Sequence, residues 1–197
     1  MYDYDKYIEI VKNRLSDKRF NHSMCVAKSA KELAKKYGAD EEKAYLAGIL
    51  HDITKEAPDE EHMELFRKGN IELTKYEIGT KKLWHAISGS VMIKELGVDD
   101  EEIVRAIRYH TTGRENMNLL EKVLYIADFI SDDRDYDGVD RMREKAKISL
   151  ETAMLEGLQF TLMEIMEREK AIHPDSVAAY NELALNKQIK DKKERTE

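Results

Sequence analysis

The stretch LAGILHDITK (residues 46–55) carries an apolar run directly into an adjacent histidine and aspartate, His51 and Asp52. Burying an ionised carboxylate without a partner is very costly, so such a residue shifts its pKa, forms an ion pair or binds a metal. The pair at the end of this run therefore leads us to look for other polar residues on apolar helix faces.

Two such residues follow later in the chain. His110 lies three residues after Ile107, and Asp128 lies four residues after Leu124, so each belongs to the apolar stripe of its helix. Taken singly, each fits a hydrogen-bonded core histidine or an interior aspartate. Few Lys or Arg share these faces, and several inward His and Asp from separate helices favour one common metal site.

Composition and periodicity predict an all-α fold. The chain has 197 residues with 42% hydrophobic and 37% charged, and only nine Gly and two Pro, fewer than turn-rich β folds need. We expect a single-domain helical bundle over residues 1–186 and a charged, disordered tail over 187–197. Residues 71–80 are expected to be irregular or weakly helical, and residues 131–140 to form a loop. Helices are expected at about 4–15, 21–37, 41–53, 58–69, 81–96, 100–110, 118–131 and 174–185, with a long helix that starts at Val139 or Ser149 and ends near Glu169.

Charge and cysteine content restrict the class of protein. The net charge is -7 and the pI about 5.5, which argues against a non-specific nucleic-acid binder. A bound dication and a few local cations can still create a site for a small anion. The single cysteine, Cys25, fits a reducing compartment, and neither a signal peptide nor a membrane span is apparent. We therefore expect a cytoplasmic protein without membrane or nucleic-acid partners.

Five short motifs occur in order along the chain: RFNH (19–22), LHDITK (50–55), LWH (83–85), IRYHTTGR (107–114) and YIADFI (125–130). Together they closely resemble the HD superfamily of helical metal-dependent phosphohydrolases. Within it they are most similar to the bacterial YqeK-type branch, the symmetrically cleaving diadenosine tetraphosphatases. The resemblance covers about residues 5–185.

This resemblance implies a centre with two divalent metal ions. One metal would be held by His22, His51, Asp52 and Asp128. Asp52 would bridge to a second metal, which is held also by His85 and His110. Relatives of this type are associated with iron, and a site of imidazoles and carboxylates without thiolate also suits manganese or cobalt.

The implied reaction is hydrolysis of diadenosine tetraphosphate to two ADP by a water activated between the two metals. The leaving group is a phosphate oxygen, so neutralising charge matters more than a strong general acid. The expected catalytic residues are Asp52, Lys55 and Arg114, and the expected substrate-binding residues are Arg19, Lys55, Thr112, Arg114 and Arg134.

Two other functions share the same residues. One is a nucleotidase or phosphodiesterase acting on another nucleotide, and the other is a nucleotide sensor without turnover, although six filled ligand positions argue against a degenerate site. The long helix after Ser149 should close the core, with a homodimer as the alternative. His62 lies on a polar helix and is expected to be exposed.

Overall fold

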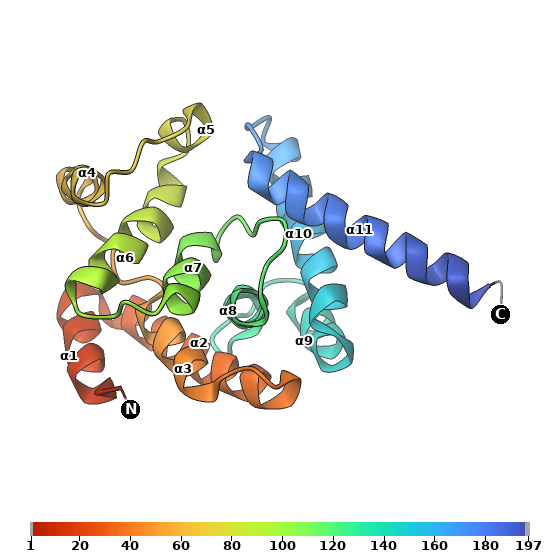
Figure 1. The fold of residues 1–197 in the computed structure, drawn as a ribbon, viewed down its shortest axis with the longest axis horizontal. Helices are drawn as coiled ribbons and strands as arrows, with labels where there is room; N and C mark the ends of the chain where they lie inside the picture. Colours follow the sequence, from red (N-terminus) through yellow and green to blue (C-terminus); the bar gives the residue numbers. More distant parts are fainter. Residues whose placement is uncertain (1, 196–197) are drawn as a thin grey trace.

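The computed structural model describes residues 2–195 and contains, within them, eleven α-helices, one short 3-10 helix and no strand (Figure 1). The predicted all-α class is confirmed. None of the described helices combines the length and apolar character needed to cross a membrane. The helices are α1 (Tyr4–Arg14), α2 (Asp17–Tyr37), α3 (Glu41–Leu50), α4 (Asp59–Lys68), α5 (Lys75–Ile78), η1 (Lys81–Leu83), α6 (Trp84–Glu95), α7 (Glu101–Tyr109), α8 (Leu119–Ile130), α9 (Val139–Ile148), α10 (Leu150–Glu167) and α11 (Pro174–Glu194).

Helices α2 and α3 form a tight antiparallel pair. The turn between them begins at Gly38, whose φ of 80° is in the left-handed region that glycine adopts without strain. A Cβ on Gly48 would lie 2.3 Å from the Cα of Ala27, so only glycine permits this helix crossing. The close approach brings His22 of α2 beside His51, with ring centroids 5.4 Å apart.

Helices α7 and α8 bury the faces that the periodicity predicts. Ile107 and Leu124 are fully buried, and both belong to the main apolar core. Asn118 caps α8 and forms a capping box with Glu121, which starts the helix in the correct phase. Asp128 is therefore presented on the inner side of α8.

The long helix predicted from Val139 or Ser149 to about Glu169 is in fact two helices, α9 and α10. Ser149 is extended, with a φ of -162°, and its side chain accepts a hydrogen bond from the Thr152 amide. It thus ends α9 and caps α10, so both predicted starting points are real helix starts. Leu150, Met154, Leu158 and Leu162 of α10 are buried, which confirms that this helix closes the core.

Several helix limits differ from the sequence predictions. Helix α2 begins at Asp17, four residues earlier than expected, because Ser16 takes the N-cap position. Helix α3 ends at Leu50, and turns follow it.

The largest difference is α11, which continues to Glu194 although we predicted a disordered tail from residue 187. Its last turns consist mainly of Lys, Gln and Glu, which favour helix even when exposed. Lys190 and Glu194 pair at 3.9 Å across one turn. Figure 1 shows this part of α11 extending away from the remaining helices. The tail residues 196 and 197 lie outside the described range.

Candidate metal centre

Six polar residues meet where five helices begin or end. They come from the second turn of α2, the first turn of α6, the positions directly after α3 and α7, and the last turn of α8. All are buried except Asp128, which is partly exposed. The six are His22, His51, Asp52, His85, His110 and Asp128, the set expected from the sequence motifs.

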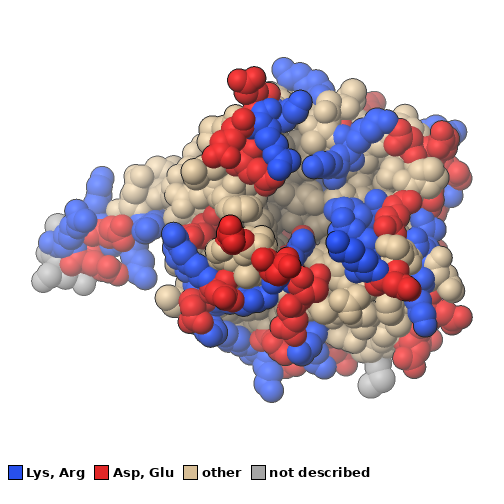
Figure 2. Space-filling view, turned by 180° about the vertical axis from the view of Figure 1, so that it is seen from behind, with Lys and Arg blue, Asp and Glu red and all other residues tan. Residues whose placement is uncertain are grey.

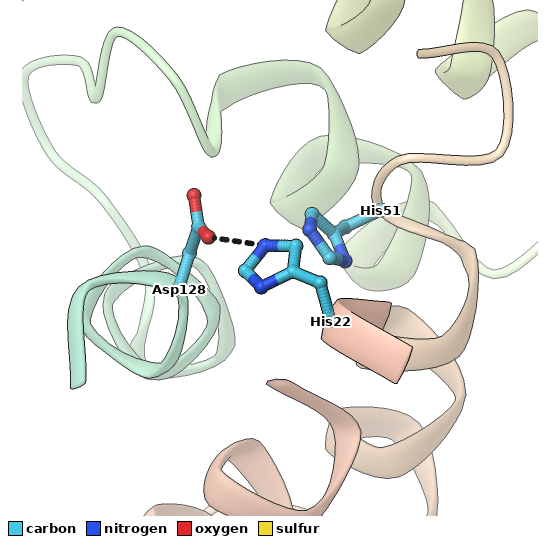
Figure 3. Close-up of side chains that lie close together, drawn as sticks. All are labelled: His22, His51 and Asp128. Carbon is cyan, nitrogen blue, oxygen red and sulfur yellow. Dashed lines mark ion pairs between the residues drawn. The ribbon is translucent and has the colours of Figure 1, made fainter. Parts of the chain in front are cut away.

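The first group consists of His22, His51 and Asp128, whose ligand atoms all lie within 4.8 Å of one another (Figure 3). His22 Nε2 is 3.0 Å from Asp128 Oδ1. His51 Nδ1 donates to the Gly48 carbonyl at 2.8 Å, so this nitrogen carries the proton and Nε2 keeps its lone pair. That Nε2 is buried and has no hydrogen-bond partner within residues 2–195. An orphaned imidazole nitrogen beside a carboxylate is the donor arrangement that a metal cation requires.

The second group consists of His51, Asp52 and His110, again with ligand atoms within 4.8 Å of one another. His110 Nδ1 donates to the Ile107 carbonyl at 2.7 Å, which leaves Nε2 with a lone pair. His85 joins this group, since its Nε2 is 3.1 Å from His110 Nε2 and 3.2 Å from Asp52 Oδ1. His51 therefore belongs to both groups and joins the two halves of the cluster.

The protonation states suit cation binding. Burial disfavours the ionised carboxylates, yet His51 beside Asp52 and His22 beside Asp128 outweigh it and hold both carboxyl pKa values well below 3.8. Burial lowers the pKa of His51 and of His85 to about 4. At neutral pH the centre thus contains carboxylates with neutral imidazoles at His51 and His85, the forms that coordinate divalent metals.

Three of the predicted phosphate-binding cations border the cluster. Lys55 Nζ donates to His85 Nε2 at 3.0 Å and is 3.4 Å from Asp52 Oδ1. Arg19 Nη1 lies 3.5 Å from Asp52 Oδ2. Arg134 pairs with Asp128 Oδ1, and its Nε donates to the Asp128 carbonyl at 2.8 Å. All three side chains are partly exposed.

A family model for the HD domain matches residues 19–132, more than half of the chain and a range that includes all six cluster residues. The chain belongs to the HD domain family. It is 39% identical over 183 residues to the symmetrical bis(5'-nucleosyl)-tetraphosphatase of Halalkalibacterium halodurans, covering 91% of this chain and 96% of the relative. The symmetrical bis(5'-nucleosyl)-tetraphosphatase of Bacillus subtilis is 37% identical, with 90% and 95% covered.

The fold is also similar to that of a solved HD protein. A crystal structure from Clostridium acetobutylicum, described as a predicted HD superfamily hydrolase involved in NAD metabolism, matches with a TM-score of 0.90. The two sequences are 37% identical, and the match covers 94% of this chain and 99% of the other. The HD domain and its two groups of His and Asp side chains indicate that this chain binds divalent metal.

Two predicted substrate contacts in the HD domain have other partners in this structure. Arg114 forms a bidentate pair with Glu121, with bonds of 2.9 and 2.8 Å, and its guanidinium lies 5.2 Å from the Tyr109 ring centroid. Thr112 is buried, and its carbonyl accepts from Ser176 at 2.8 Å. Among residues 2–195 neither forms a hydrogen bond or ion pair with the six cluster residues.

Sequence reasoning missed one residue that touches the HD cluster. Asp133 Oδ2 accepts from His22 Nδ1 at 2.8 Å, one residue beyond the matched range. A carboxylate on the far nitrogen of a histidine fixes the ring and leaves the other nitrogen to face the metal. The only available signal was the charged run at 132–135, and the sequence alone does not distinguish a loop that covers the nucleotide from a solvated charge run.

Proposed function

We propose that this chain is a symmetrical bis(5'-nucleosyl)-tetraphosphatase, which adds water to diadenosine tetraphosphate and releases two ADP. The observation that carries the proposal is the pair of adjoining donor groups that share His51, the second of which contains Asp52. Two donor groups in contact suit two cations that act on one phosphate chain. The names of the relatives from Halalkalibacterium and Bacillus support the choice of substrate.

We infer that His22, His51, Asp52 and Asp128 hold one divalent ion and that Asp52, His85 and His110 hold the other. The donors are all imidazole nitrogens and carboxylate oxygens, which fits iron first and manganese or cobalt as alternatives. When bound, two such cations neutralise phosphoryl charge and supply a water of lowered pKa.

The residues around the cluster have their own part in the reaction. Lys55, Arg19 and Arg134 present partly exposed positive charge at its border, where the phosphate chain would lie. Water attacks the second phosphorus from one end and breaks its bond to the central bridging oxygen of the tetraphosphate. That oxygen leaves as a terminal phosphate oxygen of one ADP, and the water oxygen remains on the other ADP. Because this leaving group is stable as an anion, these cations assist by charge neutralisation and the chain needs no strong general acid.

One face of the molecule has a depression whose surroundings carry both positive and negative charge. Figure 2 shows a face hollowed near its centre, with Lys and Arg interspersed with Asp and Glu around the depression. This face has no continuous basic stripe of the kind that tracks a nucleic-acid backbone. Mixed charge with local cations suits a small anionic substrate better.

The test combines metal analysis with product analysis. The purified protein is assayed for bound iron, manganese and cobalt, and then incubated with diadenosine tetraphosphate, ATP, NAD⁺ and a cyclic dinucleotide. NAD⁺ is included because of the description of the Clostridium structure. We expect two ADP from diadenosine tetraphosphate. AMP plus ATP would contradict symmetrical cleavage, and a metal-loaded protein without turnover on any of the four would contradict the enzyme.

Asp52→Ala tests the shared carboxylate directly. It should abolish activity and remove much of the bound metal, because Asp52 is the ligand that we propose both ions share. Asp132→Ala, an exposed aspartate that pairs with Lys28 at 3.0 Å, is the control and should retain both. Near-normal activity of the Asp52→Ala protein would exclude the two-metal arrangement.

A further inference from the structure

A line of hydrogen-bonded side chains runs through the buried interior from α4 to the metal cluster. His62 Nδ1 of α4 shares a hydrogen bond with Ser88 Oγ of α6 at 2.8 Å. Ser88 Oγ shares another with Thr54 Oγ1 at 2.9 Å. Thr54 Oγ1 donates to the backbone carbonyl of His85 at 2.8 Å. We call His62, Ser88 and Thr54 the inner polar line.

The first member of this line was expected to be exposed, and that prediction was wrong. His62 is only 6% exposed, because its ring stacks on Phe66 and makes a T-shaped contact with Trp84. The helix is polar overall, but His62, Leu65 and Phe66 share its buried face. Burial also lowers the pKa of His62, so the imidazole is neutral at physiological pH.

The position of the line relates it to the cluster. Thr54 follows Asp52 by two residues in the turn after α3, and its hydroxyl bonds to the carbonyl of His85 itself. Ser88 lies one helical turn after His85 on α6. The line therefore joins the backbone that carries Asp52 to the backbone that carries His85. The two side chains face each other, with Asp52 Oδ1 3.2 Å from His85 Nε2.

Stability alone does not account for such a line. Thr54 and Ser88 are fully buried, and replacing both members of a buried hydrogen bond with apolar groups of similar shape is often neutral for stability. A connected polar network instead specifies one arrangement of the elements that it joins. The arrangement that this network specifies is the spacing between Asp52 and His85, which face each other in the metal cluster.

We propose that His62, Ser88 and Thr54 are positioning residues that set the separation of Asp52 and His85 and thereby determine how tightly the centre binds divalent metal. The inference rests on the proposed assignment of Asp52 and His85 as ligands, but it does not depend on which substrate is cleaved. Loss of such supporting bonds lowers metal affinity by roughly 10- to 100-fold in other metal sites.

The experiment measures Mn²⁺ binding to the full chain by the EPR signal of free Mn²⁺, without substrate. Thr54→Val keeps the side-chain volume but removes the hydroxyl, whereas Thr54→Ser keeps the hydroxyl. Ser88→Ala has a matched control in Ser90→Ala, since Ser90 is also buried in α6 but donates to the Ile87 carbonyl at 2.7 Å, outside the line. His62→Leu breaks the line, while His62→Asn retains a polar group near the Nδ1 position.

We expect about tenfold weaker Mn²⁺ binding or more in Thr54→Val, Ser88→Ala and His62→Leu, with values near the parent protein in Thr54→Ser and Ser90→Ala and partial recovery in His62→Asn. The double variant Thr54→Val/Ser88→Ala should lose little more than either single variant, because both break one line. Each variant is scored only where its thermal melt is cooperative, and Thr54→Val, the closest in shape, decides the result. Unchanged Mn²⁺ affinity in Thr54→Val, or equal losses in Ser90→Ala and Ser88→Ala, would overturn the inference. Normal Mn²⁺ binding without ADP formation would instead contradict the proposed activity and leave this inference standing.

Discussion

Asp133 should be a major determinant of metal affinity, although it lies outside the matched HD range. Its carboxylate accepts the Nδ1 proton of His22, while His22 Nε2 faces Asp128. A hydrogen bond to a charged group contributes about 1.5–3 kcal/mol, or roughly 10- to 150-fold in an equilibrium constant. The Asp133 side chain is 22% exposed, so solvent weakens the bond and we take the lower part of that range.

Asp133→Ala should therefore weaken Mn²⁺ binding by roughly 10- to 30-fold. Asp133→Asn should lose less, because an amide oxygen can still accept the Nδ1 proton but brings no charge. The assay is titration with Mn²⁺ and, independently, the rise in melting temperature on adding Mn²⁺.

The matched control is the neighbouring aspartate. Asp132 is 69% exposed and pairs with Lys28, so Asp132→Ala removes one charge of the same loop without touching His22. It should change Mn²⁺ affinity by less than about threefold, as an exposed charge does. If Asp133→Ala binds Mn²⁺ like the parent protein, or no more weakly than Asp132→Ala, then Asp133 does not orient His22.

Three further predictions concern the scaffold. Arg114→Ala leaves Glu121, which is fully buried, without its bidentate partner, and should lower the urea-derived unfolding free energy by about 3 kcal/mol; a loss below about 1 kcal/mol would mean that other groups satisfy this carboxylate. Gly48→Ala places a methyl group 2.3 Å from the Ala27 Cα and should lower stability by at least about 1–3 kcal/mol, visible as a lower melting temperature; an unchanged melt would contradict the close crossing. The folded pKa of His62 is depressed by burial, so the unfolded chain takes up its proton first as the pH falls below 6.5, and this residue costs stability on acidification. Metal-free His62→Leu should accordingly show a smaller loss of unfolding free energy from pH 7 to 5 than the parent protein, and a parallel pH profile would contradict the burial of a neutral ring.

Helical periodicity alone predicted that two cluster residues, His110 and Asp128, would lie on the inner faces of their helices. His110 and Asp128 follow Ile107 and Leu124 on apolar stripes, and in the structure those two apolar residues are fully buried. Periodicity did not reveal that His22 would face Asp128, since their helices are far apart in the sequence and meet only in the tertiary fold. The order of the motifs supplied that association through the family resemblance.

Irregular segments were beyond this reasoning. Asp133 lies in the turn-rich stretch after α8, where no repeat indicates which of the neighbouring acidic residues points inward. His62 shows the converse error, because a helix rich in Asp and Glu can still bury one face when Leu65 and Phe66 mark it. In both cases the direction of a side chain is decided by packing against a distant element, α2 for Asp133 and α6 for His62.

Lys55, Arg134 and Arg114 were all expected to bind phosphate, but their ion-pair partners in the structure differ. Lys55 and Arg134 are paired with Asp52 and Asp128, which are proposed metal ligands, so their positive charge is placed where phosphate and metal would meet. Arg114 is paired instead with Glu121, a carboxylate of the α8 capping box outside both donor groups. For Arg114 to bind phosphate it must use the remaining N–H groups of a guanidinium that already donates to Glu121 and, through Nη1, to the Glu115 carbonyl at 2.9 Å. Its expected role in phosphate binding stays a prediction, and kinetics of Arg114→Lys can separate it from stability, since lysine retains the charge near Glu121 but loses the bidentate geometry.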